Sequence, residues 1–378
     1  MKIAVAMSGG VDSSTVAALL LQQGHELVGL SLQLWDQSRA LDENGQPLAS
    51  KCCSLDDIYD ARMVASQLGF PFYLVNLEEQ FETDVVQPFV AEYLSGRTPI
   101  PCVACNSKLK FAKLVEMADG IGVEKVATGH YARIDFDPSN DRYILRKGVD
   151  PTKDQSYFLF DLKQDQLAKT IFPLGGMHKP EVRELARAAG LRVSEKDESQ
   201  DISFIPDGDY PRFIENYVQD VEHHTPEFHQ QVEGWHPQGG DIVTSDGKKL
   251  GSHAGIHKYT VGQRRGIGVS YPLPLYVLSL DTQKNNLIVG TGDQLLGKSL
   301  IAERINWISI PELKEPMRVR AKIRYRNDEA DATIFPLEDG NVRVTFDEPQ
   351  RAITPGQATV FYDGDVVVGG GWIVKAEK

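Results

Sequence analysis

Near the start of the chain, glycines and hydroxyl side chains gather in one short turn that suits the binding of a phosphate group. The turn reads Ser8-Gly9-Gly10-Val11-Asp12-Ser13-Ser14, and it lies between an apolar stretch, residues 2–7, and a stretch rich in alanine and leucine, residues 15–20. Glycine lets backbone N–H groups approach an anion closely, the serine hydroxyls add donors, and a helix that begins here contributes the positive end of its dipole. The pattern predicts a strand, a phosphate-binding loop and a helix.

The loop belongs to neither of the two commonest nucleotide-binding types, because it lacks a Gly-Lys-Ser/Thr triplet and the G-x-G-x-x-G fingerprint. Ser-Gly-Gly-x-Asp-Ser resembles the PP-loop of ATP pyrophosphatases, which cleave ATP between its α- and β-phosphates and adenylate an acceptor. The residues expected to contact ATP are Ala6, Met7, Ser8, Gly9, Gly10, Val11, Asp12 and Ser13. Asp12 is also expected to bind Mg²⁺ or pyrophosphate, since a carboxylate beside phosphates would otherwise repel them.

Two cysteines, Cys102 and Cys105, are three residues apart in a second stretch that could do chemistry. Pro99 and Pro101 predict an extended segment here, followed by a helix from Ser107. A thiol near a helix N-terminus has a stabilised thiolate and is more reactive. Half of a zinc site is the alternative, but no second Cys-x-x-Cys or nearby His pair completes four ligands. The spacing favours redox or nucleophilic chemistry.

Both stretches need a scaffold, and the first half of the chain alternates apolar strands with helices. Further strands are expected at 26–35, 71–75 and 123–127, and helices at 55–67 and 81–93, with a polar loop over 36–52. Such alternation is typical of an α/β domain with a parallel sheet, whose ligands bind beyond the carboxyl ends of the strands. We therefore expect Leu32 to meet the adenine, Gly129 to lie close to the nucleotide and His130 to contact the substrate.

Composition limits the class of protein. The chain has 378 residues, of which 41% are hydrophobic and 25% charged, so two or three globular domains are expected. There is no apolar signal segment at the N-terminus and no apolar run long enough to span a bilayer, which favours the cytoplasm and excludes membrane partners. The four cysteines, including the adjacent pair Cys52-Cys53, fit a reduced compartment. The net charge of −13 argues against a polyanionic partner unless local basic patches override it.

Several further motifs occur together and in order. They are Gly96-Arg97-Thr98-Pro99 with the cysteine segment, Ala127-Thr128-Gly129-His130-Tyr131, Asp150-x-x-Lys153-Asp154-Gln155-Ser156, Tyr259-Thr260-x-Gly262-Gln263-Arg264, Lys322-Ile323-Arg324-Tyr325-Arg326 and Gly369-Gly370-Gly371-Trp372. With the phosphate-binding loop, they resemble the tRNA-specific 2-thiouridylases, which replace the 2-oxygen of the wobble uridine with sulfur. The resemblance covers nearly the whole chain.

The resemblance implies three domains. Residues 1–205 would form an α/β domain like the adenine nucleotide α hydrolases, residues 206–280 a small, mostly β central domain that contacts tRNA, and residues 281–378 a C-terminal β-barrel. The sequence agrees, because helical periodicity fades after Tyr217 and short alternating strands dominate from Leu275. Segments 281–286 and 338–341 are expected to be hairpin turns.

The implied chemistry has two steps. ATP, held with Mg²⁺, adenylates the uridine O2, and a cysteine persulfide then delivers sulfur to C2. Cys105 matches the family's catalytic thiol that acts on the persulfide, and a sulfur-relay protein or a cysteine desulfurase would supply the persulfide. Ser203 stands where the family has the cysteine that carries the persulfide. A hydroxyl cannot do so, which leaves an impaired sulfur relay between the two positions.

Three explanations for Ser203 stay open. The serine is an engineered substitution that traps the enzyme; or Cys102 replaces the missing thiol, with a Cys102–Cys105 disulfide closing each turnover; or the cysteines hold an iron–sulfur cluster. The cluster has a counting difficulty, because Cys102 and Cys105 supply two ligands where three or four are usual. Cys52 or Cys53 would have to complete it.

The resemblance also implies the residues that contact tRNA. They are Ile100, Pro101 and Cys102 near the target base, His130, the run Lys153, Asp154 and Gln155 around a flipped uridine, and Arg324, Tyr325 and Gln357 in the barrel. Independently, Lys322, Arg324 and Arg326 alternate after Arg318 and Arg320, which predicts a phosphate-contacting stripe on one strand. Base flipping is expected, because chemistry at C2 needs the base out of its stack.

Two rival readings remain. One is another PP-loop adenylating enzyme, such as an amide-forming ligase that uses ammonia, against which the cysteine pair and the barrel count. The other is a tRNA-binding protein with weak or no sulfur transfer, because Ser203 has replaced the carrier cysteine.

Overall fold

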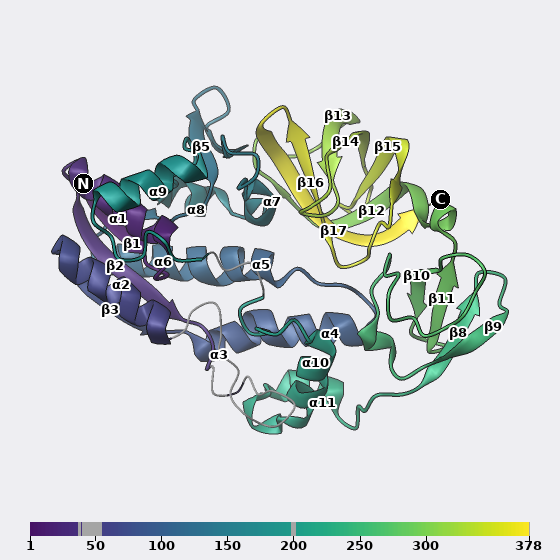
Figure 1. Ribbon diagram of the computed structural model, residues 1–378. Coiled ribbons are helices and arrows are strands. Elements are labelled where there is room, and N and C mark those ends of the chain that lie inside the picture. Colours follow the sequence, from purple (N-terminus) through teal and green to yellow (C-terminus); the bar gives the residue numbers. More distant parts are fainter. Residues whose placement is uncertain (37–38, 40–54, 198–201, 378) are drawn as a thin grey trace.

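A parallel five-stranded sheet, in the order β3-β2-β1-β4-β7, forms the N-terminal end of the molecule in this computed structural model, which describes residues 1–36, 39, 55–197 and 202–377 (Figure 1). Its strands are β1 (Lys2–Ala6), β2 (Glu26–Gln33), β3 (Phe72–Asn76), β4 (Lys125–Ala127) and β7 (Thr170–Ile171). All four neighbouring pairs run parallel, which confirms the predicted fold class. Most of the expected 36–52 loop, with Cys52 and Cys53, lies outside the described residues.

Helices cover both faces of this sheet because successive residues of β1 point to opposite sides. Ile3 and Val5 pack into one buried cluster with α1 (Val11–Gln22), α2 (Leu55–Leu68) and α9 (Lys179–Ala188). Ala4 packs into another cluster with α6 (Phe111–Gly120). Strand β1 is thus packed on both faces and is mostly apolar, which is typical of an α/β domain with helices on both sides of its sheet.

The cysteine segment is helical, so the predicted extended segment before Ser107 is wrong. One helical stretch runs through α5 (Pro101–Ala104), a π-helical turn η3 (Cys105–Lys110) and α6. Proline is favoured at the first helical position, where its missing N–H costs no hydrogen bond, and it restricts only the residue before it. Pro101 therefore starts the helix instead of delaying it, and both cysteines lie in its first turns.

A similar π-helical turn interrupts the helix expected over 81–93. It comprises α3 (Glu78–Phe81), η2 (Glu82–Val86) and α4 (Gln87–Leu94). Further helices before the central sheet are α7 (Ser156–Leu159), α8 (Gln164–Lys169), α10 (Tyr210–Gln219), η4 (Val221–His223) and α11 (Pro226–Val232). Helices α10 and α11 pack against α4 in a third cluster that also contains Cys105 and Phe204.

The central part of the chain forms a four-stranded sheet in the order β10-β11-β8-β9. Its elements are β8 (Gly240–Thr244), β9 (Lys249–His253), η5 (Ile256–Lys258), β10 (Tyr276–Asp281) and β11 (Asn286–Gly290). The expected hairpin turn between β10 and β11 is confirmed by the pairing of Asp281 with Asn286, and Asn285 adopts a φ of 52° within it. Because β11 pairs with β8, this hairpin belongs to the central sheet.

The C-terminal part is a closed six-stranded barrel, as expected. Its elements are η6 (Gly292–Leu295), β12 (Leu296–Trp307), β13 (Met317–Lys322), β14 (Ala330–Pro336), β15 (Val342–Arg351), β16 (Ala358–Asp363) and β17 (Val366–Glu377). Pairing of β12 with β17 closes it. A hairpin from the N-terminal half, β5 (Ala132–Asp137) and β6 (Arg142–Lys147), pairs onto β17 at Arg146 and Val366, a connection that the sequence did not indicate.

The prediction of a phosphate-contacting stripe of basic residues on one strand is wrong in part. Strand β13 ends at Lys322, so Arg324 and Arg326 lie in the turn that follows. Arg318 forms a two-pronged ion pair with Asp347 at 2.7 Å, which neutralises much of its charge. Basic residues at alternate positions share one face of a strand only where the chain stays extended. Among the described residues, no helix is both long and apolar enough to cross a bilayer.

Candidate active site

The loop between β1 and α1 has the backbone shape of an anion site. Gly9 adopts a φ of 74°, and a Cβ atom there would lie 2.1 Å from the carbonyl oxygen of Asp57. Gly10 is the N-cap of α1, and no side chain caps the helix from that position. The first amides of α1 therefore keep donors for an anion, at the positive end of the helix dipole.

The hydroxyl groups of the loop are arranged around the same turn. The Ser13 hydroxyl accepts a hydrogen bond from the Ser8 amide at 3.1 Å and lies 3.2 Å from the Ser8 hydroxyl. Ser14 is buried and donates to the Gly10 carbonyl at 2.8 Å, so its hydroxyl serves the helix. Ser8 is exposed, which leaves it as the accessible hydroxyl at the mouth of the loop.

Asp12 carries the strongest charge contact of the loop. The Nζ of Lys179 donates to both carboxylate oxygens at 2.7 and 2.8 Å, and the Tyr131 hydroxyl donates to one of them at 2.8 Å. Lys179 is at the start of α9 and its side chain is only 9% exposed. Sequence reasoning missed this lysine, because only the packing of α9 on α1 brings it to the loop. Binding of Mg²⁺ by Asp12 stays a prediction.

A second lysine, Lys196, holds the other side of the loop. Its Nζ donates to the Gly9 carbonyl at 3.1 Å and to carboxylate oxygens of Asp57 and Asp60, each at 2.7 Å. Partial burial lowers the pKa of Lys196, but the hydrogen bonds and charges of the two carboxylates outweigh it and raise the pKa above its ordinary value. Lys196 thus joins the loop to the first turns of α2. Sequence reasoning missed it too.

Of the residues predicted at the strand ends, Gly129 packs directly against the same loop. Gly129 follows β4, and a Cβ there would lie 2.9 Å from the Asp12 Cβ and 3.0 Å from the Ser13 amide. Glycine at 129 is therefore needed for close contact with the start of α1. Leu32 is near the end of β2 and packs partly buried against two of the apolar clusters.

His130 is a neutral imidazole in an aromatic setting. Its ring lies 5.5 Å from Phe111 and 5.9 Å from Phe172, and its Nδ1 is 2.7 Å from the Thr128 hydroxyl. Burial, and then the positive charge of Lys110, lowers the pKa of His130 to about 3. An uncharged ring at this position offers stacking and a hydrogen bond, and it carries no charge for a phosphate.

The two cysteines of the helix differ in environment. Cys102 is exposed, whereas Cys105 is buried in the cluster that also contains Trp35, Phe89 and Phe204. Phe204 follows Ser203, so the structure brings the segment of Ser203 into the same packed cluster as Cys105. Among the described residues, no group of three or more His, Cys, Asp or Glu side chains could hold a metal ion.

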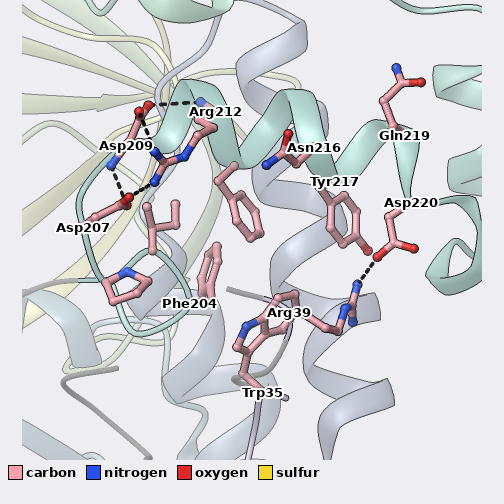
Figure 2. A pocket seen from close by; sticks show the side chains of 13 residues that line it. Trp35, Arg39, Phe204, Asp207, Asp209, Arg212, Asn216, Tyr217, Gln219 and Asp220 are labelled. Carbon is pink, nitrogen blue, oxygen red and sulfur yellow. Dashed lines mark hydrogen bonds and ion pairs between the residues drawn. The ribbon is translucent and has the colours of Figure 1, made fainter. Parts of the chain in front are cut away.

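A cavity of about 610 Å³ lies beside the segment of Ser203 (Figure 2). Its apolar lining includes Trp35, Phe204 and Phe213. The guanidinium of Arg39 lies 4.6 Å from the centre of the Trp35 ring and forms ion pairs at 3.0 Å with Glu82 and Asp220. The cavity next to Ser203 therefore combines an aromatic wall with charged and amide side chains that include Arg39, Asp207 and Arg212.

The run Lys153, Asp154 and Gln155 supports the loop between β6 and α7. Asp154 accepts hydrogen bonds from the Gly148 amide at 3.0 Å and the Ser156 hydroxyl at 2.8 Å. Gln155 accepts from the Tyr131 amide at 2.9 Å. Both side chains thus have structural partners, and Lys153 is half-buried beside them. Contact with RNA stays a prediction for all three.

The barrel residues predicted to contact RNA lie where the domains meet. Arg324 donates to the Val261 carbonyl at 2.9 Å and to the Thr354 hydroxyl, and burial lowers the pKa of its guanidinium. The Tyr325 ring packs 4.4 Å from Phe158. Gln357 donates to the Thr98 carbonyl at 2.9 Å, just before the segment of Ile100 and Pro101. Arg324 thus joins the barrel to the central part of the chain, Tyr325 joins it to α7, and Gln357 joins it to the segment before the cysteine helix.

Three family models match successive parts of the chain. A tRNA methyl transferase HUP domain matches residues 1–207, a tRNA methyl transferase PRC-barrel domain matches residues 231–291, and an aminomethyltransferase beta-barrel domain matches residues 297–373. The first alone covers more than half of the chain.

Curated relatives match along their full length. The chain is 55% identical over 373 residues to tRNA-specific 2-thiouridylase MnmA of Koribacter versatilis, covering 98% of each chain. It is 52% identical over 378 residues to the protein of the same name from Acidobacterium capsulatum, again covering 98% of each. Among solved structures, a 4-thiouridine synthetase–RNA complex with bound ATP is 16% identical with a TM-score of 0.33, over 61% of this chain and 53% of that one. So distant a likeness carries no functional argument.

Proposed function

The chain belongs to the tRNA-specific 2-thiouridylase family, and on that premise we propose that it catalyses the ATP-dependent 2-thiolation of the wobble uridine of tRNA. The observation that carries the proposal is the pairing of two sites in one α/β domain. The anion-binding loop at Gly9 and Gly10 lies at the strand ends, and a helix bearing Cys102 and Cys105 packs on the same sheet. One site suits activation of the base, and the other suits transfer of sulfur.

In the first step, the uridine O2 attacks the α-phosphorus of ATP. An O2–P bond forms, the bond to the β-phosphate oxygen breaks, and pyrophosphate leaves with the electron pair. Gly9, Gly10 and the first amides of α1 would hold the phosphates, and Lys179 and Lys196 fix the shape of that loop. Mg²⁺ bound to the phosphates would neutralise their charge. The step is needed because AMP leaves C2 far more readily than an oxide does.

In the second step, the terminal sulfur of a Cys102 persulfide attacks C2, and AMP leaves with the former O2. The Cys105 thiolate then attacks the Cys102 Sγ, so that the S–S bond to the transferred sulfur breaks and its electron pair stays on the thiouridine. The products are 2-thiouridine and a Cys102–Cys105 disulfide, which a thiol reductant returns to two thiols by supplying two electrons. A sulfur-relay protein or a cysteine desulfurase would reload the exposed Cys102.

Geometry sets a condition on that disulfide. Residues three apart on a helix have Cβ atoms about 5–6 Å apart, whereas a disulfide requires about 4 Å. The first turns of the cysteine helix must therefore shift for the bond to close, and the π-helical turn that begins at Cys105 is the place where its hydrogen bonds are least regular.

Ser203 favours a second candidate function, a tRNA-binding homologue that activates the base and stalls before sulfur transfer. An iron–sulfur cluster held by Cys102 and Cys105 is the other route to sulfur, but it needs a further ligand. Iron and acid-labile sulfide measured on anaerobically purified protein distinguish the cluster from the persulfide.

The decisive experiment supplies the protein with ATP, Mg²⁺, unmodified tRNA, and either sodium sulfide or a cysteine desulfurase with cysteine. Nucleoside mass spectrometry is expected to show 2-thiouridine, with one pyrophosphate released for each base. Pyrophosphate release that depends on tRNA but yields no thiouridine would support the stalled homologue. If tRNA causes no pyrophosphate release at all, the thiouridylase function is wrong.

A further inference from the structure

A second cavity, of about 470 Å³, lies between the cysteine helix and the barrel. Ile100, Pro101 and Ala104 line it on the helix side, and Arg304 and Trp372 line it on the barrel side. Its volume lies within the range of small-molecule sites, too small for a helical duplex but sufficient for one unstacked nucleotide. Neither Cys102 nor Cys105 lines it, so this cavity is distinct from the place where the thiols act.

Arg304 reaches the cavity through an irregular stretch of backbone. In the pairing of β12 with β17, Glu303 is opposite Trp372 and Asn306 is opposite Gly370, which leaves an extra residue bulged out of β12. Arg304 has a φ of 52° in this bulge, a left-handed conformation that costs free energy in any residue with a β-carbon. Such strain persists where the surrounding structure or a function requires it.

The bulge places a cation on an aromatic ring at the mouth of the cavity. The Arg304 guanidinium lies 4.6 Å from the centre of the Trp372 ring, and Phe160 supports Trp372 at 5.2 Å. The Arg304 side chain is 54% exposed, and Glu303 approaches it only to 3.6 Å. Arg304 thus lines the cavity as a largely exposed cation that also contacts the tryptophan ring.

Three carboxylates and three cationic side chains line the cavity. Each carboxylate has a partner within the protein: Glu92 pairs with Arg97 at 2.6 Å, Asp84 accepts from Gln80 at 2.6 Å, and Asp161 lies 3.3 Å from Lys163. The Nζ of Lys163 also donates to Asn306 at 3.0 Å, but its side chain is 57% exposed, and Lys108 is exposed on the cysteine helix. A phosphate can therefore reach the ammonium groups of Lys108 and Lys163 from solvent.

We propose that this cavity binds the tRNA nucleotide next to the reacting uridine, with its base stacked on the Arg304 guanidinium and its phosphate facing Lys108 and Lys163. Single-stranded loop nucleotides are recognised in this way, by stacking on aromatic or guanidinium planes beside basic side chains. Val85 and Phe89 line the cavity and belong to the same apolar cluster as Cys105, and Ala104, the residue before Cys105, also lines it. The inference rests on the proposed function, because it takes tRNA as the substrate.

The test replaces Arg304 with glycine. Arg304→Gly removes the side chain and relieves the left-handed conformation, so thermal unfolding is expected at the same temperature as in the wild type or higher. The Kd for unmodified tRNA, measured by fluorescence anisotropy at fixed salt, is expected to rise about tenfold. Arg304→Lys keeps the positive charge but loses the planar group. Its Kd for tRNA is expected to lie between those of the wild type and Arg304→Gly. Arg343→Ala is the matched control, since Arg343 is an exposed arginine of the same barrel outside the cavity and is expected to bind tRNA like the wild type.

Transfer RNAs with one abasic nucleotide identify the occupant. An abasic site at a neighbour of the wobble position is expected to weaken binding to the wild type and to have no added effect in Arg304→Gly. Equal tRNA affinity of Arg304→Gly and the wild type, or coupling only to the wobble position, would overturn the proposal. So would an Arg304→Gly variant that loses only the thiolation fed by cysteine desulfurase, because the cavity would then serve a protein partner. A wild type that binds no tRNA would instead contradict the proposed function itself.

Discussion

The Nζ of Lys179 lies 2.7 and 2.8 Å from the two carboxylate oxygens of Asp12, across 167 positions of sequence. The lysine is at the start of α9, and the aspartate is in the first turn of α1. Their contact holds the phosphate-binding loop against a second helix, so the charge of Asp12 is compensated within the protein. The loop is therefore fixed by residues from distant parts of the chain.

Replacing Lys179 with methionine is expected to leave the Asp12 carboxylate with its tyrosine partner and no cation. Since the lysine is buried and the carboxylate is partly exposed, the free energy of unfolding is expected to fall by roughly 2 kcal/mol. tRNA-dependent pyrophosphate release is expected to drop at least tenfold. Chemical denaturation and a pyrophosphate assay measure the two effects. The control is Arg187→Met on the same helix, which breaks an exposed ion pair between Arg187 and Glu195. It is expected to change the unfolding free energy and the pyrophosphate release little. Equal behaviour of the two variants would contradict the role of Lys179.

Gly9→Ala is expected to damage the loop in two ways. A methyl group at Gly9 meets the Asp57 carbonyl at 2.1 Å and also strains a φ of 74°. Gly24→Ala is the matched control, because Gly24 has a φ of 80° with no heavy atom within 4 Å of the new methyl group. The control is expected to cost about 1 kcal/mol of unfolding free energy and Gly9→Ala at least about twice that. Equal losses in denaturation curves would show that the close approach to Asp57 is unimportant.

Lys196→Met tests the second lysine at the loop. The change removes the donor shared by the Gly9 carbonyl, Asp57 and Asp60, so two neighbouring carboxylates lose their common cation. A loss of roughly 2–3 kcal/mol in unfolding free energy is expected, together with a higher KM for ATP. The control Lys169→Met breaks the exposed pair with Asp119 and is expected to cost less than about 0.5 kcal/mol. An unchanged KM would remove Lys196 from the organisation of the loop.

The lowered pKa of His130 predicts a dependence of stability on pH. The folded pKa is about 3, below the value of about 6.5 expected in the unfolded chain. Between those values the unfolded state binds a proton that the folded state does not, so stability is lost as the pH falls below about 6.5. The slope from this residue is at most about 1.4 kcal/mol per pH unit. Denaturation of the wild type and of His130→Gln at pH 7 and 5.5 is expected to show the smaller loss in the variant; parallel curves would refute the shift.

The cysteines predict separable phenotypes. Cys102→Ser removes the persulfide carrier and is expected to abolish 2-thiouridine formation while tRNA-dependent pyrophosphate release continues. Cys105→Ser is expected to stop after persulfide transfer, with the RNA held covalently to Cys102, which denaturing gels with and without reductant reveal. Ser203→Cys is expected to increase thiouridine yield if the serine impairs the relay. Full activity of Cys102→Ser would overturn the persulfide mechanism, and no gain with Ser203→Cys would show that position 203 is not the defect.

The sequence was a good guide where the determining interactions are local. Runs of buried apolar residues predicted the parallel sheet, and the glycine-rich loop predicted a strand-to-helix turn, because burial and backbone freedom belong to each segment. Proline misled the prediction at the cysteine segment. Pro101 was expected to keep the chain extended, but proline also starts helices, and the choice depended on the packing of the following residues into the core.

By itself, the sequence determined the α/β class, the loop at Gly9, the cysteine pair and the membership of a family. Only the tertiary structure decided which charged side chains contact that loop. It also decided that Arg324 and Gln357 join the barrel to other parts of the chain, and that the Arg304 guanidinium lies near the Trp372 ring. Each of these is a contact between residues remote in sequence, or the result of a bulge in strand pairing. Local spacing carries no information about such contacts, because they depend on which faces of the helices and sheets pack together.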